Sequence, residues 1–453
     1  MEMAISSKGP RVLMVGYNGA NNTGSEALLQ ADIEDIRAVL GPDAHITIPT
    51  LNEGNLRRYL KESRNLRIVP VTTLYFSAFR RLIRNNDLVL LVEGSTYMDT
   101  WGSPLLWAFL WATRCAAALG KPSLAYAVDA GTLSPGNRKL VRKIASRTDL
   151  IVTRNKAAAA RLRDMGVTAP MDTTADNAFT FQPREEDRGW VSREWSQAAD
   201  GVVGLAMVDF TLWPVVLKPW GKKEQCYKWP YYFSSSARRR HARDLLARGY
   251  ASLADHIAAT TGKAVALISM EQVDGSLAAR VHQLMAHPGR ARQFSAAQHD
   301  ASRMTSLLRS LDLLVTSRFH AGVLSLAAGV PQVAVGHDTR LATLYQDLGL
   351  KEEWFMETDG ITDLSSLDAA SRLFGKLRER VDRLLADPEL QQERLVRGYE
   401  EHLGRARRNR RLLEEFIARK FGMAHPHPAP ASCCQPAPAI GLESSIEAME
   451  VAV

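Results

Sequence analysis

The chain of 453 residues contains only four cysteines. Cys433 and Cys434 are neighbours near the C-terminus, whereas Cys115 and Cys226 lie far apart in the sequence. Four cysteines cannot build a disulfide framework in a chain of this length. No CxxC pair and no His/Cys spacing indicates a zinc site. We therefore expect neither a disulfide scaffold nor a bound metal.

Long apolar runs are also missing. The longest, Leu105 to Thr113, ends at Arg114 and is far shorter than the ~20 residues that a membrane span needs. The opening residues, MEMAISSKGP, contain no apolar signal core. We therefore expect a cytoplasmic protein.

The composition is that of a globular protein, with 46% hydrophobic and 23% charged residues. The formal net charge is +8. A basic excess of this size suits anionic partners, which include phosphorylated small molecules, lipid phosphates and nucleic acid. The charge alone selects none of the three.

Strand-like and helical segments alternate in two blocks, which predicts two doubly wound parallel sheets. The predicted strands cover residues 11–16, 46–48, 87–92, 123–128 and 149–153 in the first block, and 202–208, 264–270, 311–316 and 332–335 in the second. We expect an α/β protein of two Rossmann-like domains with a cleft between them. The boundaries predicted are an N-terminal domain at 1–183, a linker at 184–200, a C-terminal domain with closing helices at 201–423, and a disordered tail at 424–453.

The segment Thr316 to Gly322 follows a predicted strand and opens a helix of small residues. It carries Ser317, Arg318 and His320. Ligands of open α/β sheets bind at such carboxyl ends of strands. Arginine offers a planar fork for phosphate or carboxylate, and histidine can move a proton near neutral pH. The alternative is a local salt bridge for Arg318 and a helix cap for His320.

Other candidate residues also follow predicted strands. The loop from Gly16 to Gly24 can cradle an anion at a helix N-terminus, although it matches neither G-x-G-x-x-G nor a P-loop. Asp99 lies in the loop after strand 87–92, where a carboxylate can accept a proton from a sugar hydroxyl or can cap the helix near Leu105. Arg154 and Asp176 come at later strand ends.

The stretch from Lys218 to Arg243 interleaves lysines and arginines with tryptophans and tyrosines. Aromatic rings stack on sugars or lie at membrane interfaces, and cations attract phosphate. This pattern favours a glycan or a lipid-linked acceptor, with peripheral contact at the inner membrane face; the alternative is a solvated basic loop. No nucleic-acid motif accompanies it, so we expect no nucleic acid as partner.

Taken together, the motifs resemble the polysaccharide pyruvyl transferase family. Five patterns of this family have counterparts here, in the same order along the chain. They are Gly-Asn-x-Gly-Asp-Glu-Ala-Leu at 21–28, Gly-Gly-Gly-Ser-x-x-x-Asp at 92–99, Arg-x-x-x-Ser-x-x-x-Leu at 154–162, Asp-Pro-Ala-Phe at 176–179 and Ser-Arg-Leu-His-Ala at 317–321. The chain departs from these patterns at several positions, and residues 128–131 read Val-Asp-Ala-Gly where the family usually has a Gln-Gly-x-Gly run. Ser25 stands in place of an acid, Glu93 in place of a glycine, and Ala158 in place of a serine.

The resemblance implies a glycosyltransferase-B-like fold and transfer of a pyruvyl group from phosphoenolpyruvate to sugar hydroxyls, which forms a ketal without a cofactor. The acceptor implied is a polysaccharide glycan or its lipid-linked oligosaccharide precursor. The catalytic residues expected are His320 as general acid, Asp99 as base and Arg318 as anion holder. The substrate-binding residues expected are Arg154, Asn22, Gly24, Gly94, Ser95, Ser317 and Asp176.

Two other functions fit the same sequence. One is a glycosyltransferase that uses a nucleotide sugar, since the same architecture, basic charge and glycine loop would serve it. The other is a family member that binds glycan but has lost turnover, because Ser25, Glu93 and Ala158 depart from the family pattern.

Overall fold

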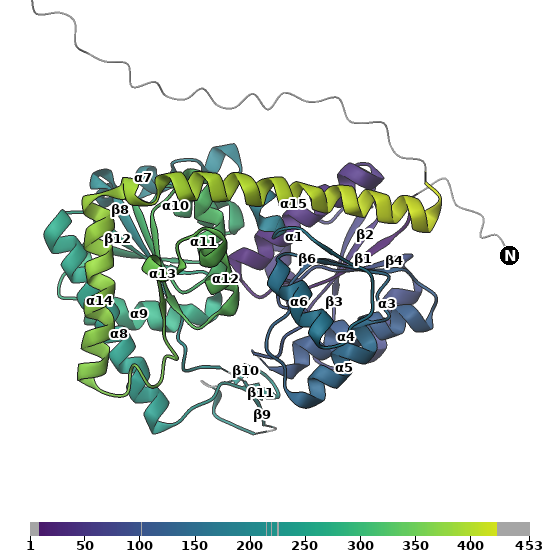
Figure 1. Ribbon diagram of the computed structural model, residues 1–453, viewed down its shortest axis with the longest axis horizontal. Coiled ribbons are helices and arrows are strands. Elements are labelled where there is room, and N and C mark those ends of the chain that lie inside the picture. The colour runs from purple at the N-terminus through teal and green to yellow at the C-terminus, as the bar shows by residue number, and fades with distance from the viewer. Residues whose placement is uncertain (1–8, 101, 214, 219, 224–225, 424–453) are drawn as a thin grey trace, which may run out of the picture.

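The computed structural model describes residues 9–100, 102–213, 215–218, 220–223 and 226–423. Two α/β domains lie side by side, and one long helix, α15 (Gln392–Phe421), runs along both of them (Figure 1). The predicted arrangement of two Rossmann-like domains is confirmed. The tail predicted at 424–453 lies outside the described residues.

The N-terminal domain contains a parallel sheet of seven strands in the order β3-β2-β1-β4-β5-β6-β7. Its strands are β1 (Val12–Val15), β2 (Ile46–Thr50), β3 (Leu66–Pro70), β4 (Leu88–Leu91), β5 (Ser123–Val128), β6 (Leu150–Thr153) and β7 (Met171–Thr173). Its helices are α1 (Thr23–Leu40), α2 (Glu53–Tyr59), α3 (Phe76–Arg84), α4 (Ser103–Ala118), α5 (Pro135–Ala145) and α6 (Lys156–Asp164). The chain order reverses beside β1, which is where ligands bind in such sheets.

The C-terminal domain contains a parallel sheet of six strands in the order β13-β12-β8-β14-β15-β16. These strands are β8 (Val202–Ala206), β12 (Ala264–Ser269), β13 (Ala291–Ser295), β14 (Leu313–Thr316), β15 (Gln332–Gly336) and β16 (Phe355–Glu357). The helices of this half are α7 (Trp190–Glu194), α8 (Ala237–Thr261), α9 (Gly275–Leu284), α10 (Ala301–Arg309), α11 (Phe319–Ser325), α12 (Thr339–Asp347), α13 (Lys351–Trp354) and α14 (Leu367–Ala386). Central strands such as β8 and β12 are buried along their whole length because helices cover both faces of the sheet.

A small antiparallel sheet departs from the Rossmann pattern. It consists of β9 (Val216–Leu217), β10 (Cys226–Lys228) and β11 (Tyr231–Tyr232), in the order β10-β11-β9. It extends from the C-terminal domain towards α4 of the N-terminal domain (Figure 1). The stretch interpreted from sequence as aromatic and basic, Lys218 to Arg243, therefore supplies β10 and β11 of this sheet and the first turns of α8.

Two segments pack differently from their sequence-based interpretation. The stretch at 184–200 is part of the second domain, because Trp190 and Trp195 are buried against Phe294 at ring-centroid distances of 5.7 and 5.4 Å. The helix α15 does not close the second domain alone. Leu413 and Phe416, near its C-terminal end, join the apolar core of the N-terminal domain. Burial of these large side chains overrides the charged composition of both segments.

Candidate functional site

A pocket of about 610 Å³ opens between the two domains. The N-terminal domain lines it with residues that follow β1 and β4, and with the first turn of α1. The C-terminal domain contributes residues that follow β12 and β14, together with aromatic side chains of the small sheet. Each domain thus presents the carboxyl edge of its sheet to the same space, as expected for ligand sites in such folds.

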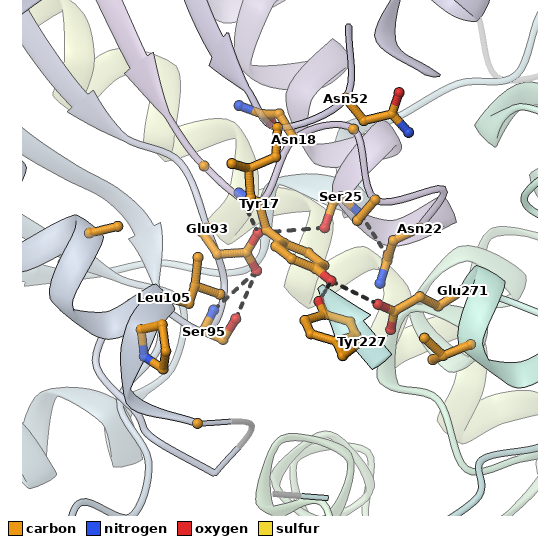
Figure 2. Close-up of a pocket in the computed structure, with 18 of the residues that line it drawn as sticks. Tyr17, Asn18, Asn22, Ser25, Asn52, Glu93, Ser95, Leu105, Tyr227 and Glu271 are labelled. Atoms are coloured by element: carbon orange, nitrogen blue, oxygen red, sulfur yellow. Dashed lines mark hydrogen bonds between the residues drawn. The ribbon is translucent and has the colours of Figure 1, made fainter. Parts of the chain in front are cut away.

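Glu93 lies at the centre of the wall that the N-terminal domain contributes (Figure 2). It is 5% exposed. Its carboxylate accepts hydrogen bonds from the backbone N–H of Tyr17 at 3.3 Å and from the N–H and hydroxyl of Ser95 at 3.2 and 3.0 Å. The hydroxyl of Ser25 lies 3.5 Å from the same carboxylate. These donors fix a carboxylate that lines the pocket.

Tyr17 connects this wall of the pocket to the C-terminal domain through hydrogen bonds of its hydroxyl. Its hydroxyl donates to Glu271 Oε1 at 3.1 Å and meets the hydroxyl of Tyr227 (Figure 2). Burial and the neighbouring Tyr227 and Glu271 raise the pKa of Tyr17 well above its ordinary value, so the phenol stays protonated. The backbone continues the link, since Asn22 and Glu271 form an antiparallel bridge. The domains therefore meet through polar contacts on one side of the pocket.

Arg318 lines the pocket from the end of β14 and is paired with two carboxylates. Its Nη1 lies 3.1 Å from Glu271 Oε2, and its Nε donates to Asp274 Oδ2 at 2.9 Å. Burial raises the pKa of Asp274 to about 6, against the opposing effect of Arg318. The cation is thus present at the predicted position, but an anionic ligand must compete with Glu271 and Asp274 for it.

His320, in the first turn of α11, also lines the pocket. It packs against Gly24 of the opposite domain so closely that a Cβ at that position would overlap the imidazole. Its Nε2 lies 3.7 Å from Asp176 Oδ2, which is too long for a hydrogen bond but close enough for attraction to a protonated ring. Within the described residues Nε2 has no hydrogen-bond partner. The imidazole is therefore held in place between Gly24 and Asp176.

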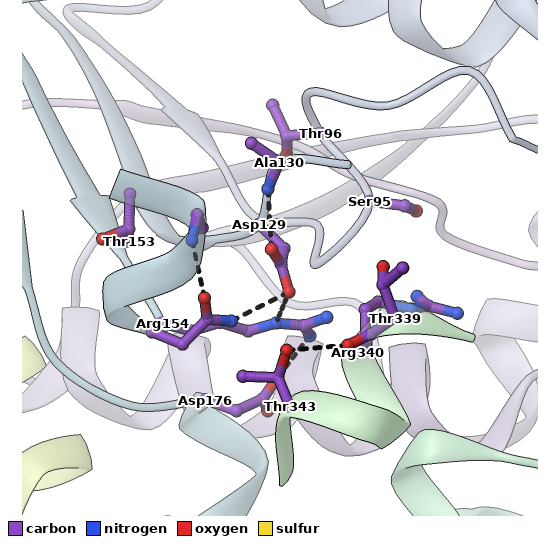
Figure 3. A network of polar contacts seen from close by, with 12 residues as sticks. Ser95, Thr96, Asp129, Ala130, Thr153, Arg154, Asp176, Thr339, Arg340 and Thr343 are labelled. Atoms are coloured by element: carbon purple, nitrogen blue, oxygen red, sulfur yellow. Dashed lines mark hydrogen bonds and ion pairs between the residues drawn. The ribbon is translucent and has the colours of Figure 1, made fainter. Parts of the chain in front are cut away.

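Arg154 lies behind His320 and outside the pocket. Its side chain is 1% exposed, and its guanidinium pairs with Asp129 at 2.9 Å and with Asp176 at 2.5 Å (Figure 3). Burial opposes the charged form, yet the two carboxylates raise the pKa of Arg154 above its ordinary value. The guanidinium also stacks on Phe319, 4.4 Å from the ring centroid. These contacts make Arg154 a support for Asp176 and His320.

Gly94 belongs to this buried network as well. A Cβ on Gly94 would overlap the guanidinium of Arg154. Burial alone would raise the pKa of Asp176, but Arg154 and His320 together lower it, so Asp176 remains ionised beside the imidazole. The structure thus places Gly94, Arg154 and Asp176 next to the pocket and not on its wall.

The structure does not bring Asp99 to the pocket. Its carboxylate accepts the backbone N–H and hydroxyl of Ser134 at 2.9 and 2.8 Å, and the side-chain amide of Asn137 at 2.8 Å. Asp99 therefore anchors the start of α5. It does not cap the helix near Leu105, and it does not face the pocket where a substrate hydroxyl would lie. Ser317 is buried beside Tyr250, with 3.3 Å between the hydroxyls, and does not line the pocket either.

Three of the expected binding residues, Asn22, Gly24 and Ser95, do line the pocket. The sequence interpretation did not single out Tyr17, Glu271 or Asp274. A signal for them was present, since Tyr17 follows β1 and the two acids follow β12. The strand-end rule that selected Arg318 would have selected them too.

No group of three or more His, Cys, Asp or Glu side chains in the described ranges is arranged to hold a metal ion. Among the helices that the structure describes, none combines the length and hydropathy required to cross a membrane.

The model of the polysaccharide pyruvyl transferase family matches residues 22–339, well over half of the chain. The match begins at the cap of α1 and ends just beyond β15, so it includes both sides of the pocket.

Solved structures with the same two-domain architecture include UDP-N-acetylglucosamine 2-epimerases. The Neisseria meningitidis enzyme bound to UDP-GlcNAc has a TM-score of 0.57 at 10% identity, over 90% of this chain and 100% of that one. The S. aureus MnaA-UDP structure has a TM-score of 0.57 at 11% identity, over 91% and 96%. The Rickettsia bellii enzyme has a TM-score of 0.52 at 10% identity, over 91% and 99%. At these identities the likeness shows a shared glycosyltransferase-B-like fold.

Proposed function

Because the chain belongs to the polysaccharide pyruvyl transferase family, we propose that it transfers the pyruvyl group of phosphoenolpyruvate to two hydroxyls of a sugar. The acceptor is a polysaccharide or its lipid-linked precursor, and the product is a pyruvate ketal. The observation that supports this proposal most directly is that Arg318, His320 and Glu93 line one interdomain pocket.

The chemistry requires a proton donor, an anion holder and a proton acceptor. A proton adds to the methylene carbon of phosphoenolpyruvate, and positive charge develops on the adjacent carbon. A sugar hydroxyl attacks that carbon and loses its proton. Inorganic phosphate then departs with the electron pair of its C–O bond. A second hydroxyl attacks the same carbon and closes the ring, and the departing phosphate takes up its proton. The acceptor gains one pyruvate and loses one water.

In this proposal His320 donates the proton to the methylene carbon, because its side chain lines the pocket and its Nε2 has no hydrogen-bond partner among the described residues. Arg318 binds the phosphate or carboxylate of the donor and stabilises charge as phosphate leaves. Glu93, instead of Asp99, accepts the proton of the attacking hydroxyl, since it is the carboxylate that the N-terminal domain holds on the pocket wall.

The size of the pocket fits two substrates. Ligand pockets commonly measure about 300–1,000 Å³, and the volume here is about 610 Å³. Phosphoenolpyruvate alone is a small molecule, so a pocket of this volume leaves room for a sugar beside it.

The test is phosphate release from phosphoenolpyruvate in the presence of candidate acceptor glycans, followed by mass spectrometry of the glycan. We expect a mass gain of one pyruvate less one water. His320→Gln should lower turnover by at least about a hundredfold while leaving the melting temperature unchanged, because glutamine fills the site but transfers no proton. Near-wild-type turnover of this variant would refute the role of His320.

A binding experiment separates this proposal from the nucleotide-sugar alternative. Phosphoenolpyruvate should raise the melting temperature of the wild-type protein, and UDP should not. Stabilisation by UDP alone would favour a glycosyltransferase. Stabilisation by phosphoenolpyruvate without any modified glycan would favour a binding protein that has lost turnover.

A further inference from the structure

Exposed apolar side chains concentrate on one end of the molecule. Of the eleven large apolar side chains that are exposed in the described part of the chain, seven lie on or beside α3, α4, α5 and the small sheet. They include every exposed tryptophan and phenylalanine in that part. These seven residues are Leu74, Phe76, Trp107, Leu140, Leu217, Trp220 and Trp229. We call this surface the aromatic face.

The same helices carry a strong positive charge. From the start of α3 to the end of α5, residues 76–145, there are nine Lys and Arg against four Asp and Glu, a net charge of +5 out of +8 for the whole chain. Eight of the nine cations are exposed, whereas none of the four acids is. Glu93 and Asp129 are buried, and Asp87 is paired with Arg11. The aromatic face is therefore basic.

The aromatic face connects with the pocket through a row of rings. Trp111 on α4 meets Phe76 edge-on at 5.3 Å, Phe76 lies 4.7 Å from Tyr75, and Tyr75 lies 5.2 Å from Phe79. Phe76 is 43% exposed, while Tyr75 and Phe79 line the pocket. An apolar path thus leads from the exposed end of the molecule into the interdomain space.

The part of the pocket that this path enters is itself apolar. We call it the apolar arm. Apolar side chains from the end of β3, from α3 and from α4 line it, namely Val71, Tyr75, Phe79, Leu105, Ala108 and Phe109, and Thr73 lines the pocket beside them. The hydroxyl of Tyr75, the polar atom of this group, already donates to the carbonyl of Pro104 at 3.1 Å. A sugar would find few hydrogen-bond partners among these side chains, whereas a hydrocarbon chain would gain by leaving water for them.

We propose that the aromatic face docks on an anionic lipid bilayer and that the apolar arm receives the hydrocarbon part of a lipid-linked acceptor; the second half of this statement rests on the proposed function. Tryptophan side chains lie at the headgroup level of membranes. Clustered Lys and Arg are attracted by anionic lipids, at about 1 kcal/mol for each residue near the surface. The combination of exposed rings with unopposed cations fits a membrane surface, to which both features bind at once.

The experiment measures binding of the full chain to sedimented vesicles, without any substrate. We expect binding to vesicles of phosphatidylcholine mixed with phosphatidylglycerol, little binding to phosphatidylcholine alone, and release at high salt. Leu74→Ser with Trp220→Ser changes two side chains that are 74% and 77% exposed and do not line the pocket. This double variant should bind the anionic vesicles at least about tenfold more weakly.

A charge-reversal pair supplies the matched control. Arg80→Glu with Arg84→Glu alters exposed arginines of α3, and Arg407→Glu with Arg411→Glu makes the same change in net charge on α15. Figure 1 shows α15 along the edge of the molecule opposite to α5 and the small sheet. The α3 pair should weaken vesicle binding at least about tenfold, and the α15 pair should not. The proposal would be overturned if both pairs weakened vesicle binding equally. It would also be overturned if the wild-type protein bound neutral and anionic vesicles equally well.

The two levels of the proposal fail in different ways. A protein that pyruvylates a soluble glycan but does not bind anionic vesicles would refute membrane docking and leave the proposed function intact. If docking is correct, the Leu74→Ser/Trp220→Ser variant should lower turnover on a lipid-linked acceptor in vesicles relative to turnover on the same soluble glycan. An unchanged ratio of the two rates would refute the role of the aromatic face in acceptor delivery.

Discussion

The hydroxyl of Ser25 lies 3.5 Å from the carboxylate of Glu93 on the wall of the interdomain pocket. These are two of the positions at which the chain departs from the family pattern: an acid is replaced at Ser25, and a glycine is replaced at Glu93. From their contact we infer that the two departures belong together. On this inference, the carboxylate that the family has in the first turn of α1 is replaced by one from the end of β4, in the same part of the pocket.

The contact predicts that the two substitutions compensate each other. Glu93→Gly should lower turnover by at least about a hundredfold, because it removes the carboxylate that we propose as base. Glu93→Gly combined with Ser25→Asp restores the family arrangement and should recover at least about a tenth of the wild-type rate. The measurement is phosphate release with an acceptor glycan. If the double variant is as slow as Glu93→Gly alone, a carboxylate at position 25 cannot replace the carboxylate at position 93 in the reaction.

Gly24 predicts a second effect on turnover. Gly24→Ala would force a methyl group into the imidazole of His320 and displace the proposed acid. We expect at least about a hundredfold lower turnover with the protein still folded. Gly136→Ala is the control, since Gly136 also lies near the start of a helix, α5, and a Cβ there meets nothing within 4 Å. Equal activities of the two variants would show that His320 tolerates displacement.

The raised pKa of Asp274, about 6, predicts a pH dependence of donor binding. Above that pH the ionised Asp274 offsets the charge of Arg318; below it the protonated acid leaves more of that charge for an anionic ligand. Wild type should bind phosphoenolpyruvate about tenfold more weakly than Asp274→Asn at pH 8, and the two should converge as the pH falls below about 6. The ratio cancels titration of the ligand itself. A constant ratio between pH 5 and 8 would contradict this reasoning.

Arg154 predicts an effect on stability. Arg154→Met leaves Asp129 and Asp176 buried without their cation, which should lower the free energy of unfolding by about 3–5 kcal/mol. Adding Asp129→Asn and Asp176→Asn removes the unpaired charges and should recover much of the loss. Urea denaturation measures both variants. If Arg154→Met is as stable as wild type, the ion pairs of Arg154 with Asp129 and Asp176 do not stabilise the fold.

The amino-acid sequence determined the class of fold and the place of the site along the chain. Alternating apolar runs and amphipathic segments specify parallel strands with crossover helices, and strand ends such as Thr316 to Gly322 mark the edge where ligands bind. Arg318 and His320 could be selected on that basis, because their position at a strand end is a local property.

Only the tertiary structure decided what each charged side chain faces. Arg154 and Asp99 also follow strands, yet the first is buried between two carboxylates and the second anchors a helix. Glu93 lines the pocket although it appeared in the sequence only as a departure from a pattern. The physical reason is that ion pairing and desolvation depend on distances across residues far apart in the chain, and no local pattern encodes those distances.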